Sequence, residues 1–265
     1  MTARLPAIDA LLSPWNRNDA PGTVVAVARK GSVIHAAGYG MADLRHGIAL
    51  DTRTVMRIGS QTKQFTVLLA LMLERDGKLS MGDDLRRYLP WLPAYPAPVT
   101  LQHMADNQSG LRDFLQMMSW SGLPLAGPST RATAREIIGR HAEVNFPPGE
   151  QMVYCNTGFF LLSEILEEVS GRSYNELLAE RITGPTGMAD SRLMARDTEV
   201  HPRLADHHVR GPSGGWERAQ WGLALGGEGG MISTAEDMLR WQAHLAAPDP
   251  GMAPLLARMT RPAKF

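Results

Sequence analysis

A serine and a lysine stand three positions apart in the stretch IGSQTKQF, residues 58–65. The apolar residues that follow recur at helical spacing, and they are Phe65, Leu68, Leu69, Met72 and Leu73. We therefore expect Ser60 and Lys63 to be neighbours at the first turn of a buried helix that stops near Gly77. A desolvated lysine can lose its proton and act as a base, which an arginine cannot. The pair alone also fits an N-cap serine followed by a solvated lysine.

A second pair of polar residues lies in the stretch FPPGEQMVYCNTGFF. Tyr154 and Asn156 flank Cys155 just before a helical pattern that should end at Gly171. In an extended chain residues 154 and 156 point to the same side, so a phenol and an amide would face one cavity. Taken singly, the tyrosine could serve packing, and Asn156 could be a helix N-cap.

Together the two pairs predict nucleophilic chemistry. A serine hydroxyl is a poor nucleophile until a base takes its proton, and a neutral lysine or a lysine-stabilised tyrosinate can do so without histidine. Ser60 near a helix start would also offer its own N–H to a developing oxyanion. Asn156 would orient either the lysine or an amide of the substrate.

Six motifs occur in the order seen in a known group of enzymes. They are SQTK, NQSGLRD, PPGE, YCN, GPTGM and GGEGGMISTAEDM. In this order the chain resembles the penicillin-recognising serine hydrolases, in the branch of class C β-lactamases, D-aminopeptidases and esterases, and NQSGLRD with YCN is most similar to D-aminopeptidases. The resemblance implies that Ser60 is the acylated nucleophile, Lys63 and Tyr154 are acid/base groups, and Asn156 is a substrate-binding residue.

The same resemblance implies an α/β (α+β) fold of the β-lactamase/transpeptidase type, with a small antiparallel sheet layer and a mostly helical domain. Residues 4–13 predict a short amphipathic helix, and the Val-rich runs around Lys30-Gly31 predict a hairpin. We expect residues 1–60 to form the N-terminal part of the α/β domain, 61–230 the helical domain, and 231–265 a return helix. That helix should begin with capping boxes at Ser233 and Thr234.

The third motif of the resembled family, Lys-Ser/Thr-Gly or His-x-Gly, does not occur in this sequence. In the family the strand that carries it also supplies the second oxyanion N–H. We therefore expect the C-terminal sheet strands to come from a downstream segment, a second chain or a homodimer. The function predicted is a serine hydrolase acting on small amides, peptides or esters, without cofactor or metal. The alternative is a binding or regulatory protein, or an inactive fragment, with the family's shape.

Three other patterns resemble functional motifs but favour a structural interpretation. The sequence GPSGG around Ser213 matches a nucleophile elbow in letters but lies in a polar, Gly-rich stretch, which favours a loop, as do residues 121–130. His201, His207 and His208 near Asp206 lack metal-ligand spacing, which favours surface histidines. The glycines at 226, 227, 229 and 230 precede no Lys-Ser/Thr and indicate close backbone packing rather than a phosphate loop.

Composition limits the classes of partner. The chain has 265 residues, 44% of them hydrophobic, and a formal net charge of zero, so no global field would attract nucleic acid or an anionic membrane. No stretch is long and apolar enough for a membrane span, and the N-terminus lacks a secretory pattern. One cysteine, Cys155, allows no intrachain disulfide, which agrees with a reducing compartment. We expect a cytoplasmic protein.

Overall fold

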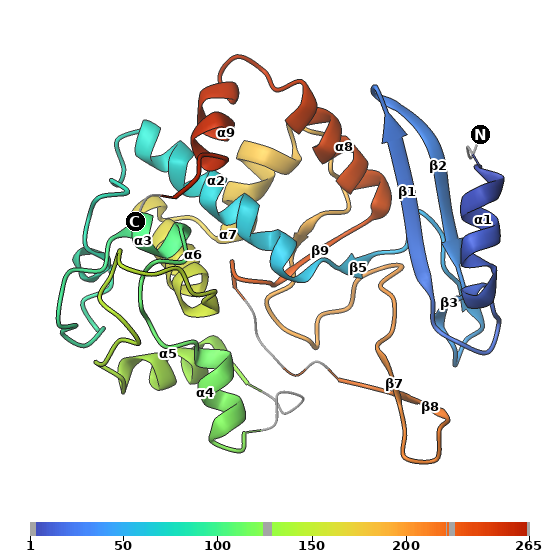
Figure 1. Ribbon diagram of the computed structural model, residues 1–265, viewed down its shortest axis with the longest axis horizontal. Coiled ribbons are helices and arrows are strands. Elements are labelled where there is room, and N and C mark those ends of the chain that lie inside the picture. Colours follow the sequence, from blue (N-terminus) through green and yellow to red (C-terminus); the bar gives the residue numbers. More distant parts are fainter. Residues whose placement is uncertain (1–3, 124–128, 221, 223–225, 264–265) are drawn as a thin grey trace.

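The computed structural model of the protein describes residues 4–123, 129–220, 222 and 226–263. An N-terminal layer of strands lies at one end of the molecule, and packed helices lie at the other (Figure 1). The strand layer contains α1 (Pro6–Leu12), β1 (Thr23–Arg29), β2 (Ser32–Tyr39), β3 (Met41–Asp43) and β4 (Ile48–Ala49). The helical part contains α2 (Thr62–Arg75), α3 (Leu101–Ala105), α4 (Phe114–Trp120), α5 (Arg131–Gly139), α6 (Asn156–Ser170), α7 (Tyr174–Leu178), α8 (Ala235–Ala246) and α9 (Ala253–Met259).

The predicted N-terminal hairpin is confirmed. Strands β1 and β2 pair antiparallel, with Thr23 opposite Tyr39 and Arg29 opposite Ser32. Lys30 and Gly31 both have positive φ angles at the turn, a conformation that matches the twist of hairpin strands. The helix predicted at residues 4–13 is present as α1, although none of its residues is buried.

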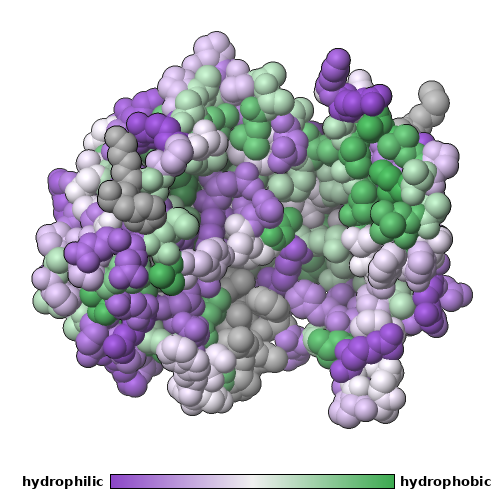
Figure 2. Space-filling model, in the orientation of Figure 1, coloured by the Kyte–Doolittle hydropathy of each residue, from purple (hydrophilic) through white to green (hydrophobic). Residues whose placement is uncertain are grey.

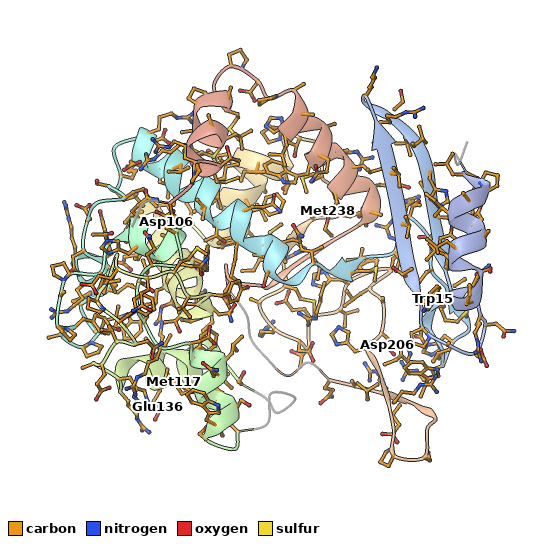
Figure 3. The ribbon with its side chains drawn as sticks, in the orientation of Figure 1. Trp15, Asp106, Met117, Glu136, Asp206 and Met238 are labelled. Atoms are coloured by element: carbon orange, nitrogen blue, oxygen red, sulfur yellow. The ribbon has the colours of Figure 1, made fainter. Side chains whose placement is uncertain are left out.

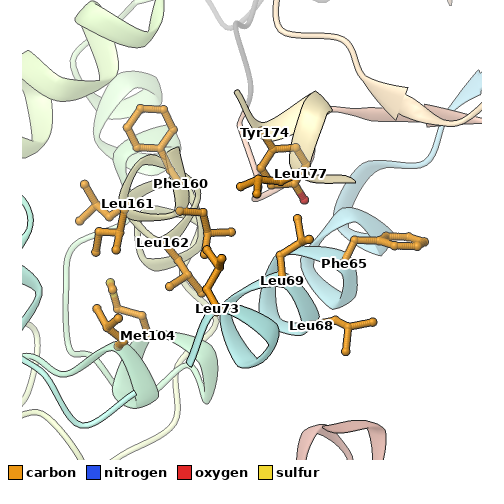
Figure 4. Packing of buried hydrophobic residues seen from close by; sticks show 14 of the residues in the cluster. Phe65, Leu68, Leu69, Leu73, Met104, Phe160, Leu161, Leu162, Tyr174 and Leu177 are labelled. Atoms are coloured by element: carbon orange, nitrogen blue, oxygen red, sulfur yellow. The ribbon is translucent and has the colours of Figure 1, made fainter. Parts of the chain in front are cut away.

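The hydrophobic core is centred on α2 and α6, which pack against each other (Figure 4). Phe65 and Leu69 of α2 and Leu161 of α6 are completely buried. Each such side chain stabilises the fold by roughly 1.5–3 kcal/mol relative to exposure. Helix α6 ends at Gly171 in the left-handed conformation, as the sequence predicted. The start of α6 and the residues just before α2 are therefore anchored to one rigid core.

A short sheet that the sequence analysis did not predict joins distant parts of the chain. Its order is β5 (Met56–Arg57), β9 (Met231–Ser233) and β6 (Arg192–Leu193), with both outer strands antiparallel to β9. Ile58 also donates its N–H to the carbonyl of Met231. Strands of two or three residues are too short to show an alternating pattern. This sheet places the chain before Ser60 against the glycine-rich loop before β9.

The hairpin of β7 (His208–Arg210) and β8 (Trp216–Arg218) contains Ser213. That serine is exposed in the turn, so the loop interpretation is confirmed. Of the other predicted loop, residues 124–128 lie outside the described residues.

The histidines that were predicted to lie at the surface are only partly exposed. His201, His207 and His208 are partly buried, because this segment packs against the N-terminal strands. The N–H of Leu44 donates to Nε2 of His208, and the N–H of Asp206, labelled in Figure 3, donates to the carbonyl of Ala42. Among the described residues no group of three or more His, Cys, Asp and Glu side chains could hold a metal ion.

Helix α8 begins with one half of the capping box predicted at Thr234. The Thr234 hydroxyl accepts the N–H of Asp237 at 3.1 Å. The predicted capping box at Ser233 is wrong, because Ser233 belongs to β9 and its hydroxyl lies 2.7 Å from that of Ser191. In the described part of the chain, none of the helices has the length and apolar character needed to cross a membrane.

Candidate active site

Ser60 lies at the surface, in a 3-10 turn (Gly59–Gln61) that leads directly into α2. It therefore precedes the α-helix instead of belonging to its first turn. Its Oγ lies 3.1 Å from Nζ of Lys63 and 2.5 Å from the hydroxyl of Tyr154. The two residue pairs singled out in the sequence thus meet at one hydroxyl group.

Lys63 is buried, with 8% of its surface exposed, so its amine depends on protein acceptors. Nζ donates to Ser60 Oγ at 3.1 Å, to Asn156 Oδ1 at 2.8 Å and to the carbonyl oxygen of Glu228 at 2.5 Å. Three acceptors match the three N–H bonds of an ammonium group. Nζ also lies 4.7 Å from the centroid of the Tyr154 ring, whose face attracts a cation.

Tyr154 is positioned by the loop that carries the NQSGLRD motif. Asn107 has a positive φ of 57° and binds the chain on both sides of the tyrosine. Its carbonyl accepts the N–H of Val153 at 3.0 Å, and its side-chain Oδ1 accepts the N–H of Cys155 at 3.0 Å. The motif therefore fixes the extended segment from which the phenol reaches Ser60.

Asn156 is the first residue of α6, and the N-cap position belongs to Cys155, which makes no side-chain cap. The alternative that Asn156 is the N-cap is therefore wrong. Asp113 accepts the N–H of Asn156 at 2.5 Å through Oδ2 and caps α4 through Oδ1. Because Asn156 does not cap the helix, its amide oxygen is available to accept from Nζ of Lys63.

Cys155 lies between these two polar residues but points into the core. Burial raises the pKa of its thiol to about 11, so it stays protonated at neutral pH. Its Sγ contacts the carbonyl of Leu111 at 3.3 Å. This cysteine is therefore no candidate for the nucleophile.

Glu228 is a member of this site that the sequence analysis missed. Burial raises the pKa of its carboxyl group to about 7, and both carboxyl oxygens lie 3.0 Å from the N–H of Gly226. A Cβ on Gly227 would lie 2.6 Å from the hydroxyl of Thr66, which confirms close packing as the reason for glycine there. The sequence signal that could have identified Glu228 as a site residue was a single glutamate between two pairs of glycines.

A cavity of about 300 Å³ opens beside Lys63, between α2, α3, α6 and α9. Its walls include Val67, Asn107, Phe159 and Arg258, a mixture of apolar and polar groups. The volume is at the lower end of the range for small-molecule sites.

A family model and several D-aminopeptidases match this sequence. The model of the family described as Beta-lactamase matches residues 8–264. A D-aminopeptidase from Cereibacter sphaeroides is 36% identical over 253 residues, which are 93% of this chain and 47% of that protein. A D-aminopeptidase from Gluconobacter oxydans is 32% identical over 264 residues, 100% of this chain and 49% of that protein. The chain spans about half the length of the curated relatives it matches.

Solved structures with the same fold support the predicted fold class. The octameric penicillin-binding protein homologue from Pyrococcus abyssi superposes with a TM-score of 0.82 at 23% identity, over 97% of this chain and 59% of that one. The D-amino acid amidase from Ochrobactrum anthropi SV3, complexed with L-phenylalanine amide, has a TM-score of 0.74 at 25% identity, over 91% of this chain and 69% of that one. The predicted β-lactamase/transpeptidase-like fold is confirmed.

The raised pKa of Glu228 predicts a pH-dependent stability. Between the ordinary pKa of 4.5 and about 7, the unfolded chain ionises this carboxyl while the folded protein keeps it protonated. Stability is therefore lost as the pH rises through this window. We expect Glu228→Gln to stabilise the protein relative to wild type by up to about 3 kcal/mol more at about pH 8 than at about pH 5.

Urea unfolding of both proteins at the two pH values measures this difference. The matched control is Glu217→Gln, which makes the same change at an exposed glutamate. Equal pH dependence in wild type and Glu228→Gln would show that the Glu228 carboxyl ionises normally in the folded protein.

Proposed function

This chain belongs to the Beta-lactamase family, and we propose that it is a serine hydrolase that forms an acyl-enzyme on Ser60 with small amides, peptides or esters. The observation that carries the proposal is the position of the Ser60 hydroxyl, within hydrogen-bonding distance of both Tyr154 and Lys63. The names of the curated relatives favour D-amino acid peptides over β-lactams as substrates.

In the proposed acylation step, the base form of the Tyr154 and Lys63 pair takes the proton from Ser60 Oγ. In this proposal the phenolate form of Tyr154 is the direct acceptor, which the 2.5 Å contact with Ser60 Oγ supports, and the Lys63 ammonium stabilises its negative charge. Oγ then bonds to the substrate carbonyl carbon, with the Ser60 N–H contributing to the oxyanion site. The bond to the leaving amine or alcohol breaks, and the leaving group takes the proton from Tyr154.

Hydrolysis of the acyl-enzyme follows the same steps with water in place of Ser60. Tyr154 takes a proton from the water, the hydroxide bonds to the acyl carbon, and the bond to Ser60 Oγ breaks. The proton returns to Ser60 Oγ. Asn156 keeps Lys63 in place through both steps because its amide oxygen accepts from Nζ.

The strand layer also supports a proposal about a partner. Within the described residues β1 pairs with β2 alone, which leaves its other edge without a strand. Val24, Val25 and Val27 of β1 are only partly buried, and hydrophobic residues gather over these strands in Figure 2. Such an edge readily accepts another strand. We propose that an additional segment of polypeptide, or a second copy of the chain, pairs with β1.

The first prediction from this proposal concerns the nucleophile. A fluorophosphonate probe should phosphonylate Ser60, because the pair beside it activates this hydroxyl alone. Peptide mass spectrometry locates the adduct. Ser60→Ala should abolish labelling, whereas Ser213→Ala, which alters the exposed hairpin turn, should leave it unchanged. An adduct on Ser213, or labelling that survives Ser60→Ala, contradicts the proposal; no labelling at all favours a binding or regulatory protein.

The second prediction concerns the acid/base pair. Lys63→Ala and Tyr154→Phe should each slow phosphonylation of Ser60 by roughly 10²–10⁴-fold, the usual contribution of acid/base groups. Because both residues serve one proton transfer, the double variant should be little slower than either single variant. If the fold-reduction in the double variant equals the product of the two single fold-reductions, the two residues have independent roles.

The third prediction concerns the open edge of β1. If a second copy covers it, light scattering should detect dimers whose fraction rises with protein concentration, and Val25→Lys, which adds charge to this strand, should dissociate them. If another segment covers it, a longer chain that includes the segment should show slowed amide exchange in β1. The absence of dimers at every concentration, together with unchanged amide exchange of β1 in the longer chain, would contradict the proposal.

A further inference from the structure

The loop formed by residues 226–230 supplies one of the three acceptors of Lys63, the carbonyl oxygen of Glu228. This loop is fixed between α2 and α6 by hydrogen bonds to its second glycine. The N–H of Gly227 donates to Ser163 Oγ at 3.0 Å, and its carbonyl accepts from the hydroxyl of Thr66 at 2.7 Å. These hydrogen bonds therefore hold the Glu228 carbonyl in position to accept from Nζ of Lys63.

The side chain of Glu228 folds back on the same loop. Its two carboxyl oxygens both accept the N–H of Gly226 at 3.0 Å, and 1% of the residue is exposed. The carboxyl group thus connects the start of the loop to the residue that carries the acceptor for Lys63.

The charged surroundings of Glu228 come from four helices. Lys63 on α2 and Arg131 on α5 are the cations that act on it, and Tyr174 on α7 is the nearby phenol. Arg131 is already paired with Glu164 on α6 at 3.1 Å. In the part of the chain that the structure describes, no lysine or arginine nitrogen lies within salt-bridge distance of the Glu228 carboxyl group.

A buried carboxyl group without an ion-pair partner lowers stability when it ionises, and glutamine would fill the same space without that loss. A role in packing alone therefore does not require glutamate at this position. The nearby group that an ionised carboxylate can favour is the Lys63 ammonium, whose carbonyl acceptor belongs to the same residue.

We infer that Glu228 is a positioning residue for Lys63: its side chain holds the loop that presents the carbonyl acceptor, and its ionised form stabilises the ammonium. The inference rests on the proposed function of Ser60 and deepens it. Since the ammonium stabilises the Tyr154 phenolate, ionisation of Glu228 should speed acylation. Because burial raises the pKa of Glu228 to about 7, this effect should arise near neutral pH.

The rate of Ser60 phosphonylation tests this inference. Glu228→Gln keeps the shape of the side chain and removes its charge. We expect its rate to be within about twofold of wild type at about pH 6, and about three- to tenfold lower at about pH 8. Ser163→Ala is the matched control, because it removes the other side-chain acceptor of the loop without changing charge. Its rate relative to wild type should be the same at both pH values.

A second readout does not depend on catalysis. The sequence contains four lysines, Lys30, Lys63, Lys78 and Lys264, so carbon-13 labelling of lysine Cε gives a simple spectrum, and Lys63→Ala assigns the signal of Lys63. In wild type the Lys63 signal should shift in a step near pH 7 as Glu228 ionises. That step should be absent in Glu228→Gln and retained in Ser163→Ala.

The outcomes separate the two proposals. A step that persists in Glu228→Gln, or a rate ratio for this variant that does not change with pH, overturns the role of Glu228. If wild type shows the step but Ser60 is never labelled, the coupling between Glu228 and Lys63 stands and the hydrolase proposal fails.

Discussion

The burial of the Lys63 ammonium is the constraint on which the rest of the site depends. An ammonium removed from water needs an acceptor for each proton, and the chain supplies them from three separate segments. Ser60 comes from the turn before α2, Asn156 from the start of α6 and the Glu228 carbonyl from the loop before β9. Ser60, the proposed nucleophile, is itself one of the acceptors, so holding the lysine also places the Ser60 hydroxyl.

The elements around these three segments hold them in fixed positions relative to one another. The packed pair α2 and α6 fixes two of the three acceptors, because both helices are anchored in the same core. Strand β9 pairs with β5 and so ties the glycine-rich loop to the turn that carries Ser60. Asn107 and Asp113 bind backbone N–H groups around Cys155 and Asn156, which fixes the direction of the Tyr154 and Asn156 side chains. The motif between residues 107 and 113 therefore acts on the site through the backbone.

The sequence predicted those parts of the fold and site that have strong local signals. The hairpin at Lys30-Gly31, the buried helix after Ser60 and the helix ending at Gly171 all depend on periodicity and turn chemistry, and all are present. The meeting of Ser60, Lys63, Tyr154 and Asn156 was also predicted, because motif order identified the family. Strands β5, β6 and β9 are too short for any pattern, and Glu228 acts partly through a backbone carbonyl, which has no sequence signal. The division into domains at residues 60 and 230 stays a prediction.

The central claim is that the acyl group of the substrate is transferred to Ser60 and then hydrolysed from it. Tyr154 and Lys63 transfer the proton in both steps. This claim is tested most directly by acid-quenching the wild-type protein during reaction with a D-alanine ester and mapping the adduct by peptide mass spectrometry. The account predicts a D-alanyl group on the peptide that contains Ser60, no such group in Ser60→Ala, and slowed turnover of the ester by Tyr154→Phe. Ester turnover by wild type with no acyl group on Ser60 would contradict it.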